Sequence, residues 1–378
     1  MNPYFSPCPR GLESALCEEL SEIGASEIRV AEGGASFLGS LETAYRANLE
    51  SRIASRVLWN ILESDYGSEA DIYDATDSLP WEKWFSPDRT IKVNLAATKS
   101  PLRSLEFATL KIKDAVCDRF RKTRGRRPSV DTLNPDIRIH AHLARDRFSL
   151  YIDTSGEALF KRGLRHFSVE APLRENLAAG ILRLSGWKPG IALLDPMCGS
   201  GTFLLEAAQT ALRIAPGSRR NFAFEKLENF DREKWEAIRK ASLERQKPVE
   251  PLQIFGSDIS GRALDAARKN LVEAGLEKAV VLKQANFLEL SPPAESGILV
   301  TNPPYGVRIG EENELSALYP LMGDALKKKY AGWNAYFFTA DMRLPKLIRL
   351  AVSRRIPLYN GALECRLFEY KMVSGGMR

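Results

Sequence analysis

Residues 193–208, LLDPMCGSGTFLLEAA, constrain the fold of this 378-residue chain more than any other segment. An apolar run ends at Asp195, Gly199 and Gly201 follow in a short loop, and an Ala- and Leu-rich segment comes next. This order predicts a buried strand, a loop whose backbone can approach a ligand, and a helix, as in an open α/β sheet. The loop is not a P-loop, since Gly-Lys-Ser/Thr is missing, and Leu204 replaces the third glycine of a dinucleotide fingerprint.

Beyond residue 168 the chain alternates strand-like and helix-like patterns, which predicts a parallel α/β sheet. Asn360 and Gly361 lie between two strand-like runs, so the sheet is expected to close with an antiparallel hairpin. Residues 214–250, rich in Lys, Arg and Glu, are expected to form a helical insertion between the first helix and the second strand. The strands expected before the hairpin are IALLD, LQIFGSD, VVLKQANF, GILVT and AYFFTAD.

The first 165 residues have a mixed α+β pattern instead. Residues 3–40 predict a strand, a helix and two short strands, and residues 43–62 predict a further helix from apolar residues at helical spacing. A strand, an amphipathic helix and two alternating strands are expected at IKVNLAAT, SLEFATLKIKDAVCDRF, IRIHAHLA and RFSLYIDTS. His140 and His142 share a face of one strand, and without a third candidate ligand we interpret them as ordinary sheet residues.

Charge is distributed unevenly along the chain. The sequence has 54 Lys and Arg against 48 Asp and Glu, a formal net charge of +6, but residues 89–127 alone hold 12 Lys or Arg against three acids. That stretch is +9 and the remainder is −3. A solvated helix face is the ordinary alternative. The run RFRKTRGRRP is nevertheless denser than solubility requires, and it favours a polyanionic partner such as nucleic acid.

Cysteine usage and hydropathy indicate the cellular setting. The five cysteines are widely spaced without a CxxC pair, so neither a disulfide framework nor a metal site is expected. The N-terminus lacks the apolar core of a secretory signal, and no uncharged apolar run of about 18 residues occurs. We therefore expect a soluble, reduced protein in the cytoplasm, with no membrane partner.

Asp258 ends the predicted strand QIFGSD, 63 residues beyond Asp195. An acid at the tip of the second strand can accept both ribose hydroxyls of an adenosyl ligand, because a carboxylate offers two acceptor oxygens. The alternative is that Asp258 caps the following helix, and both roles can coexist.

The sequence TNPPYG, residues 301–306, follows the strand GILVT. Two prolines stiffen this loop and fix Asn302 relative to Tyr305. The Asn302 side-chain carbonyl and the Pro303 backbone carbonyl can accept the two hydrogens of a planar exocyclic amine, which directs its lone pair toward a methyl electrophile. Tyr305 offers a face on which the target base can stack. This chemistry rests on positioning and electrostatics, without a metal or a covalent nucleophile.

Together, DPMCGSGT, SDIS, QANF and TNPPYG resemble the class I S-adenosylmethionine-dependent methyltransferases that modify exocyclic amino groups of nucleic-acid bases. Within these, PRGLE, LKIKDAVCD, RGRRPSVDTLNPDIRI and APLRENLAA resemble the THUMP-domain RNA methyltransferases, most closely the 23S rRNA guanine-N2 methyltransferase half of a bifunctional bacterial enzyme. The likeness runs nearly end to end. It implies a Rossmann-like α/β methyltransferase sheet with a closing hairpin, preceded by an α+β ferredoxin-like and THUMP RNA-binding region.

The resemblance also implies domain bounds and site residues. We expect a ferredoxin-like part at 1–43, a THUMP domain at 44–155, a junction at 156–167 and the methyltransferase domain at 168–378. The residues expected to bind S-adenosylmethionine are Asp195, Pro196, Gly199, Ser200, Gly201, Thr202, Asp258, Ile259, Asn286 and Phe287. Those expected to bind and activate the guanine amine are Asn302, Pro303, Pro304 and Tyr305. Those expected to contact RNA are Lys111, Lys113, Arg121, Lys122, Arg124, Arg126, Arg127 and Arg165.

Two features depart from the family pattern. Asn286 stands where an acidic residue commonly meets the adenine amine, and its amide oxygen is expected to accept that hydrogen bond more weakly. No counterpart of the second methyltransferase module of the bifunctional enzyme is expected. The implied activity is methylation of a guanine N2 amine in structured 23S rRNA. The alternatives are an adenine-N6 methyltransferase acting on DNA or RNA, since NPPY serves either amine, and a non-catalytic RNA-binding ribosome-assembly factor.

Overall fold

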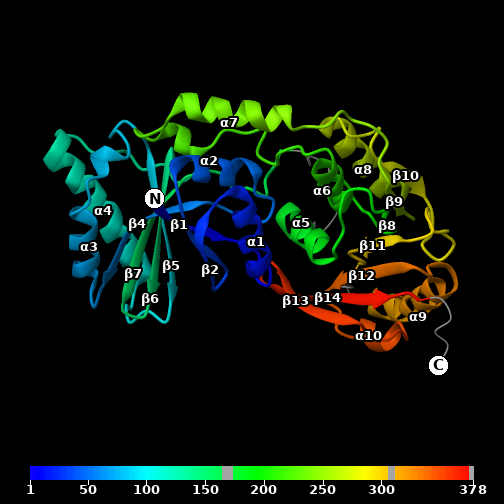
Figure 1. Cartoon of the computed structure of the whole chain (residues 1–378). Helices are drawn as coiled ribbons and strands as arrows, with labels where there is room; N and C mark the ends of the chain where they lie inside the picture. The colour runs from blue at the N-terminus through cyan, green and yellow to red at the C-terminus, as the bar shows by residue number, and fades with distance from the viewer. Residues whose placement is uncertain (164–172, 305–310, 374–378) are drawn as a thin grey trace.

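The computed structural model describes residues 1–163, 173–304 and 311–373, and leaves the side chains of residues 311–315 undescribed. The described residues form two seven-stranded sheets, one in each half of the chain (Figure 1). The N-terminal sheet has the strand order β2-β3-β1-β4-β7-β6-β5. Its strands are β1 (Asn2–Pro7), β2 (Ser26–Ala31), β3 (Gly34–Gly39), β4 (Leu58–Asp65), β5 (Ile91–Thr98), β6 (Ile137–Ala144) and β7 (Arg147–Asp153).

The helices of the N-terminal half are α1 (Glu13–Ile23), α2 (Leu41–Glu50), α3 (Glu69–Asp77) and α4 (Leu105–Arg124). The sequence pattern did not predict α3, which begins at a capping box formed by Ser68 and Asp71. Helices α3 and α4 lie side by side at the outer end of the sheet (Figure 1). A short 3-10 helix, η1 (Trp81–Lys83), packs against α4.

The helix predicted over residues 43–62 is wrong in its second half. Helix α2 ends at Glu50, and residues 58–65 form β4, which pairs antiparallel with β7. Glu19 of α1 stabilises the turn between α2 and β4. Its carboxylate accepts hydrogen bonds from the Ser51 hydroxyl at 2.6 Å and the Arg52 amide at 2.8 Å. Apolar residues in this segment share helical spacing by coincidence, and tertiary pairing with β7 determines the structure.

The C-terminal sheet has the order β10-β9-β8-β11-β12-β14-β13. All pairings are parallel except those of β14, which is antiparallel to both β12 and β13. Gly361, at φ 66°, turns the chain between β13 and β14, so the parallel sheet with a closing antiparallel hairpin is confirmed. Its strands are β8 (Leu193–Asp195), β9 (Ile254–Asp258), β10 (Val281–Gln284), β11 (Gly297–Thr301), β12 (Trp333–Thr339), β13 (Arg354–Asn360) and β14 (Leu363–Lys371).

Helices separate these strands in the chain. They are α5 (Glu175–Leu184), α6 (Thr202–Ala211), α7 (Arg232–Glu244), α8 (Gly261–Ala274), α9 (Glu311–Lys329) and α10 (Leu344–Leu347). The strand order changes direction at β8, which has β9 on one side and β11 on the other. An open α/β sheet binds its ligand beyond the carboxyl ends of the strands at such a switch point. The architecture therefore directs attention to the residues that follow β8, β9 and β11.

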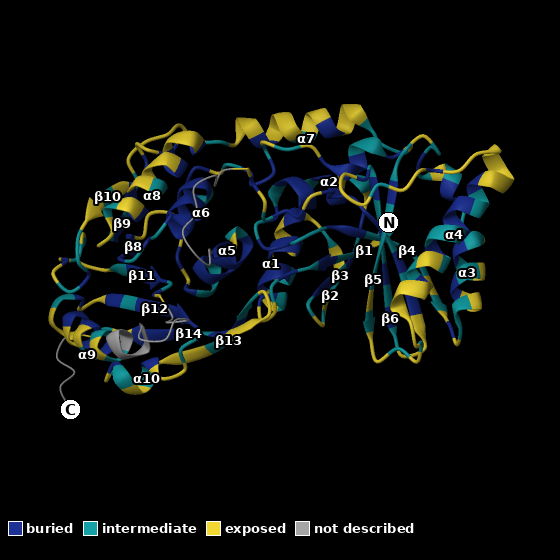
Figure 2. Cartoon of the chain, turned by 180° about the vertical axis from the view of Figure 1, so that it is seen from behind, coloured by how far each residue is buried: buried dark blue, intermediate teal, exposed yellow. Residues whose placement is uncertain are grey.

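The segment predicted as a helical insertion, residues 214–250, contains the 3-10 helix η2 (Ala223–Lys226) and α7. It crosses back to the N-terminal half and lies along α2 (Figure 1). Tyr45 of α2 stacks on Phe224 at 4.3 Å between ring centroids and meets the edge of Trp235 at 6.0 Å. The outward face of α7 is exposed (Figure 2). The insertion thus joins the two halves through a buried aromatic cluster.

A buried ionic contact also joins the halves. Arg162 of the junction donates a hydrogen bond to Glu206 of α6 at 2.7 Å, and both side chains are 1% exposed. The same guanidinium donates to the backbone carbonyl of Arg52, whose own side chain lies 3.7 Å from Glu206. Burial raises the pKa of Glu206, while Arg162 and Arg52 oppose that rise. Two guanidinium groups therefore compensate one buried carboxylate.

The described ranges contain neither a membrane-spanning helix nor a cluster of metal ligands. No helix there is both long and apolar enough to cross a membrane. No group of three His, Cys, Asp or Glu side chains there is arranged to hold a metal ion. His140 lies 3.4 Å from the buried Asp153 carboxylate, and its partner in the sequence pattern, His142, contacts the Thr98 hydroxyl at 3.2 Å.

Candidate active site

Three polar residues end neighbouring strands at the switch point. Asp195 ends β8, Asp258 ends β9, and Asn302 follows β11. Since β8 pairs in parallel with both β9 and β11, the three residues lie on one edge of the sheet. The structure therefore brings these three residues, which the sequence analysis selected, together at one edge.

The glycine loop folds over the end of β9. The Gly199 amide donates to an Asp258 carboxylate oxygen at 3.0 Å, and the Cys198 amide donates to the Ser257 carbonyl at 2.9 Å. The backbone φ angles of Gly199 and Gly201 are 52° and 82°, values that residues other than glycine rarely adopt. These hydrogen bonds fix the loop against the end of β9, immediately before α6 begins.

Two other predicted loop residues are fixed by their backbone. The Pro196 carbonyl accepts a hydrogen bond from the Ser257 hydroxyl at 3.3 Å, and the Ser200 carbonyl accepts one from the buried Asn270 amide at 3.1 Å. Thr202 is the first residue of α6 and is buried. The sequence analysis missed the role of Asn270. The sequence did contain an indication of this role, because Asn270 is the one polar residue on the otherwise apolar buried face of α8, and a buried amide needs a hydrogen-bond partner.

Asp195 is buried beneath this loop. Burial, with a smaller contribution from the Asp258 charge, raises the pKa of Asp195 to about 8, although the hydrogen bond from the Met197 amide acts in the opposite direction. The Met197 amide donates to Asp195 at 3.2 Å. A cationic ligand group placed against this carboxyl would favour its ionised form. The ammonium of a methionine moiety fits that requirement.

Asp258 does not cap α8. The Ser260 side chain takes that role by accepting from the Ala263 amide. The two Asp258 oxygens accept instead from the amides of Gly199 and Ser260, at 3.0 and 2.9 Å. Each carboxylate oxygen has a second acceptor site. The carboxylate is therefore oriented by the backbone and remains able to accept hydrogen bonds from ligand hydroxyls.

The residues predicted to meet an adenine ring lie in different environments. Ile259 is 69% exposed beside Asp258, so its side chain is accessible to a flat apolar ligand surface. Phe287 is buried and packs against Tyr330 at 5.9 Å between ring centroids, so it supports the site from below. The Asn286 side-chain oxygen accepts from the Leu288 amide at 3.0 Å. That bond uses part of the acceptor capacity that adenine recognition would require.

Asn302 carries an unsatisfied acceptor. Its side-chain oxygen Oδ1 is buried and has no hydrogen-bond donor within the described part of the chain. A buried acceptor without a protein donor is able to accept a hydrogen bond from a ligand at this edge of the sheet. Pro303 is buried and Pro304 is exposed. Tyr305, predicted to stack on the target base, lies outside the described residues.

The predicted RNA-contacting residues lie on α4 and the loop that follows it. Arg121, Lys122, Arg124, Arg126 and Arg127 are exposed. Three of them form ion pairs: Arg121 with Asp118 at 2.9 Å, Lys122 with Asp77 at 2.7 Å, and Arg126 with Asp88 at 2.8 Å.

Asp77 and Asp88 lie before the basic stretch in sequence, so counting charge over residues 89–127 missed their contribution. Arg124 and Arg127 have no carboxylate partner among the described residues, and both stay available to a polyanion. Lys113 pairs with its neighbour Asp114, and Lys111 lies over the Phe107 ring at 5.3 Å. Arg165 lies outside the described residues.

Models of three protein families match consecutive parts of the chain. They are the RlmL ferredoxin-like domain at residues 3–58, the THUMP domain at 66–153 and the RMKL-like methyltransferase domain at 162–369. The last covers more than half of the chain. The chain belongs to the RMKL-like methyltransferase family. This family assignment confirms the resemblance inferred from the sequence, and it agrees with the sheet order and the glycine loop.

Relatives of the RMKL-like chain fall into two length classes. The Synechocystis sp. protein slr0064, whose name proposes an RNA methyltransferase, is 37% identical over 98% of this chain and 97% of its own length. Ribosomal RNA large subunit methyltransferases K/L of Syntrophotalea carbinolica and Psychromonas ingrahamii are 41% and 40% identical over 98% of this chain. The chain spans 53% and 50% of those two proteins, about half their length.

Solved structures match the RMKL-like chain along nearly its whole length. SMU.472, titled as a methyltransferase candidate complexed with SAH, is 31% identical with a TM-score of 0.90, covering 98% of both chains. A protein of Listeria monocytogenes, titled as a predicted N6-adenine-specific DNA methylase, is 29% identical with a TM-score of 0.89, covering 98% of this chain and 96% of its own. Both halves of the fold are therefore shared with these proteins.

Proposed function

We propose that this protein transfers the methyl group of S-adenosylmethionine to the exocyclic N2 amine of a guanine in 23S rRNA. The unpaired, buried Asn302 oxygen at the edge that holds Asp195 and Asp258 is the observation that supports this proposal most directly. An acceptor without a donor suits an amine substrate, and the two aspartates suit the methionine and ribose parts of the cofactor.

The described residues fit S-adenosylmethionine. Asp195, beneath the loop, would face the cationic methionine part, and the backbone at Gly199 and Gly201 leaves space for close approach. Asp258 would accept hydrogen bonds from the ribose hydroxyls, and the exposed Ile259 would contact the adenine ring. When bound, the cofactor supplies an electrophilic methyl group on a sulfonium.

The protein's own contribution to chemistry is orientation of the amine. Asn302 Oδ1 and the Pro303 carbonyl accept the two amine hydrogens, so the nitrogen lone pair leaves conjugation with the base and points toward the methyl group. The proline pair limits backbone movement of these acceptors. Loss of the amine proton follows methyl transfer. The target base would stack on the ring of Tyr305.

The RNA substrate class is supported by two findings. A THUMP domain matches residues 66–153, and the relatives named for large-subunit ribosomal RNA align along 98% of this chain. Because the chain spans half of those relatives, the substrate stays a proposal for this protein. Arg124 and Arg127, which form no salt bridge to a carboxylate among the described residues, supply exposed positive charge on the THUMP side.

Adenine N6 is the second candidate acceptor. The same two carbonyl acceptors serve either amine, and the Listeria monocytogenes structure is titled as an adenine-specific DNA methylase. A non-catalytic assembly factor is disfavoured, because the glycine loop and the Asn302 acceptor that methyl transfer would require lie at the same sheet edge.

The deciding experiment is nucleoside analysis after methyl transfer. We expect the purified chain, incubated with S-adenosylmethionine and protein-free 23S rRNA, to produce N2-methylguanosine detected by mass spectrometry. The same protein incubated with double-stranded DNA is the control. N6-methyladenosine as the product would reassign the amine. Absence of any methylated nucleoside, with cofactor binding intact, would favour the assembly-factor alternative.

Asp258→Ala is expected to weaken S-adenosylmethionine binding by about 10- to 100-fold, because hydrogen bonds to a charged acceptor are worth about 1.5–3 kcal/mol. Asp258→Asn, which keeps one acceptor oxygen, should lose less. Titration calorimetry measures both dissociation constants. Asp265→Ala, which removes an exposed carboxylate of α8 that pairs only with Arg268, is the matched control and should bind like the wild type. Equal affinity of Asp258→Ala and Asp265→Ala would remove Asp258 from the cofactor site.

A further inference from the structure

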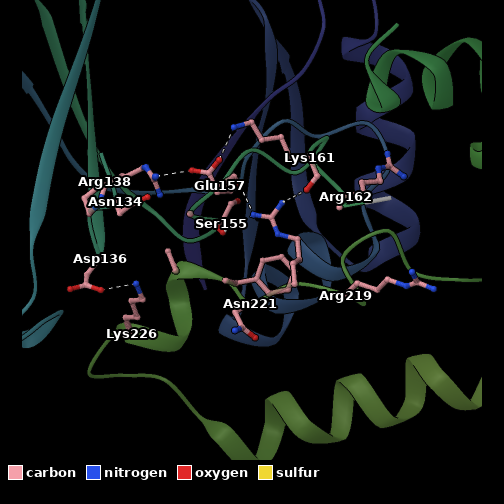
Figure 3. Close-up of a pocket in the computed structure, with 16 residues that line it drawn as sticks. Asn134, Asp136, Arg138, Ser155, Glu157, Lys161, Arg162, Arg219, Asn221 and Lys226 are labelled. Carbon is pink, nitrogen blue, oxygen red and sulfur yellow. Dashed lines mark hydrogen bonds and ion pairs between the residues drawn. The ribbon is translucent and has the colours of Figure 1, made fainter. Parts of the chain in front are cut away.

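A second concave site lies away from the candidate active site, where three parts of the chain meet (Figure 3). The pocket has a volume of about 470 Å³, within the usual range of ligand-binding pockets. Its walls come from residues 134–138 of the THUMP region, residues 155–163 of the junction and residues 219–226 of the insertion. The cationic side chains that line it are Arg138, Lys161, Arg162, Arg219, Arg220 and Lys226, against the two carboxylates Asp136 and Glu157.

Arg220 forms the structural centre of the pocket. Its guanidinium donates to the backbone carbonyls of Glu157 at 2.5 Å and Ala158 at 2.8 Å, and it lies over the Phe222 ring at 5.3 Å. Burial lowers the pKa of Arg220, and its buried Nε atom has no partner within the described ranges. The neighbouring Arg219 donates to the last carbonyls of α8. Within the described ranges both arginines hydrogen-bond to neutral backbone carbonyls, and the charges of Glu157 and Asp153 act on Arg220 without a direct hydrogen bond.

The rim of the pocket carries cations in weaker, exposed contacts. Glu157 receives hydrogen bonds from both Arg138 and Lys161, at 2.8 and 2.9 Å, so one carboxylate is shared by two cations. Lys226 contacts Asp136 at 2.6 Å (Figure 3). The Lys161 side chain is 64% exposed and that of Lys226 is 41% exposed. Exposed ion pairs are worth at most about 1 kcal/mol, so an incoming anion can replace them at little cost.

The side chains that line the pocket indicate which class of ligand it can bind. The pocket offers many hydrogen-bond donors with excess positive charge, and the one aromatic residue among its described lining residues, Phe222, is buried. A base would require an exposed stacking surface, whereas a phosphodiester requires only donors and positive charge.

The position of the pocket indicates which phosphodiester it meets. Residues 134–138 come shortly after Arg124, the last residue of α4, and Arg127 of the following loop. On the other side, Arg162 of the pocket wall contacts Glu206 in the second turn of α6, the helix that begins at the glycine loop. The pocket therefore connects the basic THUMP surface with the catalytic half.

We propose that this pocket binds the sugar-phosphate backbone of the RNA substrate, as an anchor separate from the basic surface of α4. The proposal rests on RNA being the substrate class, and it adds where a phosphate of that RNA is held. Lys161 and Lys226 make exchangeable contacts with phosphate oxygens, while Arg220 keeps the junction and the insertion in place as the pocket wall.

The test uses the full chain with both exposed lysines reversed in charge, Lys161→Glu together with Lys226→Glu. The matched control is Lys240→Glu together with Arg268→Glu, which reverses two exposed cations that also form local ion pairs on α7 and α8. Fluorescence anisotropy measures binding of protein-free 23S rRNA fragments between about 50 and 200 mM salt. We expect the pocket variant to bind about tenfold more weakly at 100 mM salt. Its slope of log affinity against log salt should fall by about 1.4, for two lost phosphate contacts on a single strand.

The control should stay within twofold of the wild type, and S-adenosylmethionine affinity should be unchanged in both variants. RNA affinity and salt slope equal to the wild type in the pocket variant would overturn the proposal, as would a wild type that does not bind RNA. If the wild type binds RNA in this pocket-dependent manner but methylates none, the proposed function fails and the anchor stands. Displacement of RNA by millimolar inorganic phosphate, as complete as by excess RNA, would instead identify a free-anion site and overturn the assignment to RNA.

Discussion

Asn302→Ala is expected to reduce the rate of RNA methylation by about 10²–10³-fold while the dissociation constant of S-adenosylmethionine stays within about twofold. Removal of one preorganised hydrogen-bonding group that acts on developing charge typically costs that much in kcat. The side-chain oxygen of Asn302 is buried and unpaired among the described residues, so the free protein has little to lose from its removal. The loss should therefore appear in turnover and not in folding.

Single-turnover methylation and titration calorimetry separate these quantities. Asn94→Ala, which truncates another half-buried asparagine on β5 of the N-terminal sheet, controls for general effects of such a change. Asn302→Asp keeps an acceptor in place and should retain more activity than Asn302→Ala. A rate for Asn302→Ala within threefold of the wild type would mean that the amine is oriented by other groups.

Glu206→Ala is expected to lower the free energy of unfolding by about 3–5 kcal/mol. Glu206 compensates Arg162 and Arg52, and its removal leaves two guanidinium groups in an environment where Arg162 is 1% exposed. Breaking a buried ion pair by removing one partner has this cost because the remaining charge stays desolvated. Urea denaturation measures the change.

Two comparisons identify the cause of that loss. Glu244→Ala removes an exposed carboxylate of α7 that pairs with Lys240 at 3.9 Å, and it should change stability by less than about 0.5 kcal/mol. The double variant Glu206→Leu with Arg162→Met removes both charges and should be more stable than Glu206→Ala alone. If Glu206→Ala unfolds within 1 kcal/mol of the wild type, the buried contact contributes little to holding the halves together.

The sheet edge that carries the candidate site could be predicted from sequence because its signals are local. Asp195, Asp258 and Asn302 each follow an apolar strand, and parallel strands bring their carboxyl ends to one edge. The glycine loop is likewise a short-range pattern, since Gly199 and Gly201 adopt backbone angles that other residues avoid. These features need no knowledge of distant parts of the chain.

The remaining features depend on contacts between distant residues. The false helix over 43–62 arose because the spacing of apolar residues is compatible with a helix, whereas pairing of β4 with β7 decides the outcome. The sequence overestimated the uncompensated positive charge of residues 89–127. Asp77 and Asp88 precede this stretch in sequence but pair with its cations in space. In the pocket wall Arg220 donates a hydrogen bond to Glu157, 63 residues earlier in the chain, so no local pattern could reveal the pocket.

The aromatic contact between α2 and the insertion has an evolutionary consequence. Tyr45 belongs to the N-terminal half, whereas Phe224 and Trp235 belong to a segment inside the methyltransferase half, and all three are buried together. A foreign N-terminal module attached at the junction would leave these rings facing water and the insertion without its support. The two halves are therefore expected to resist exchange as independent modules, because a replacement N-terminal half would also have to cover Phe224 and Trp235.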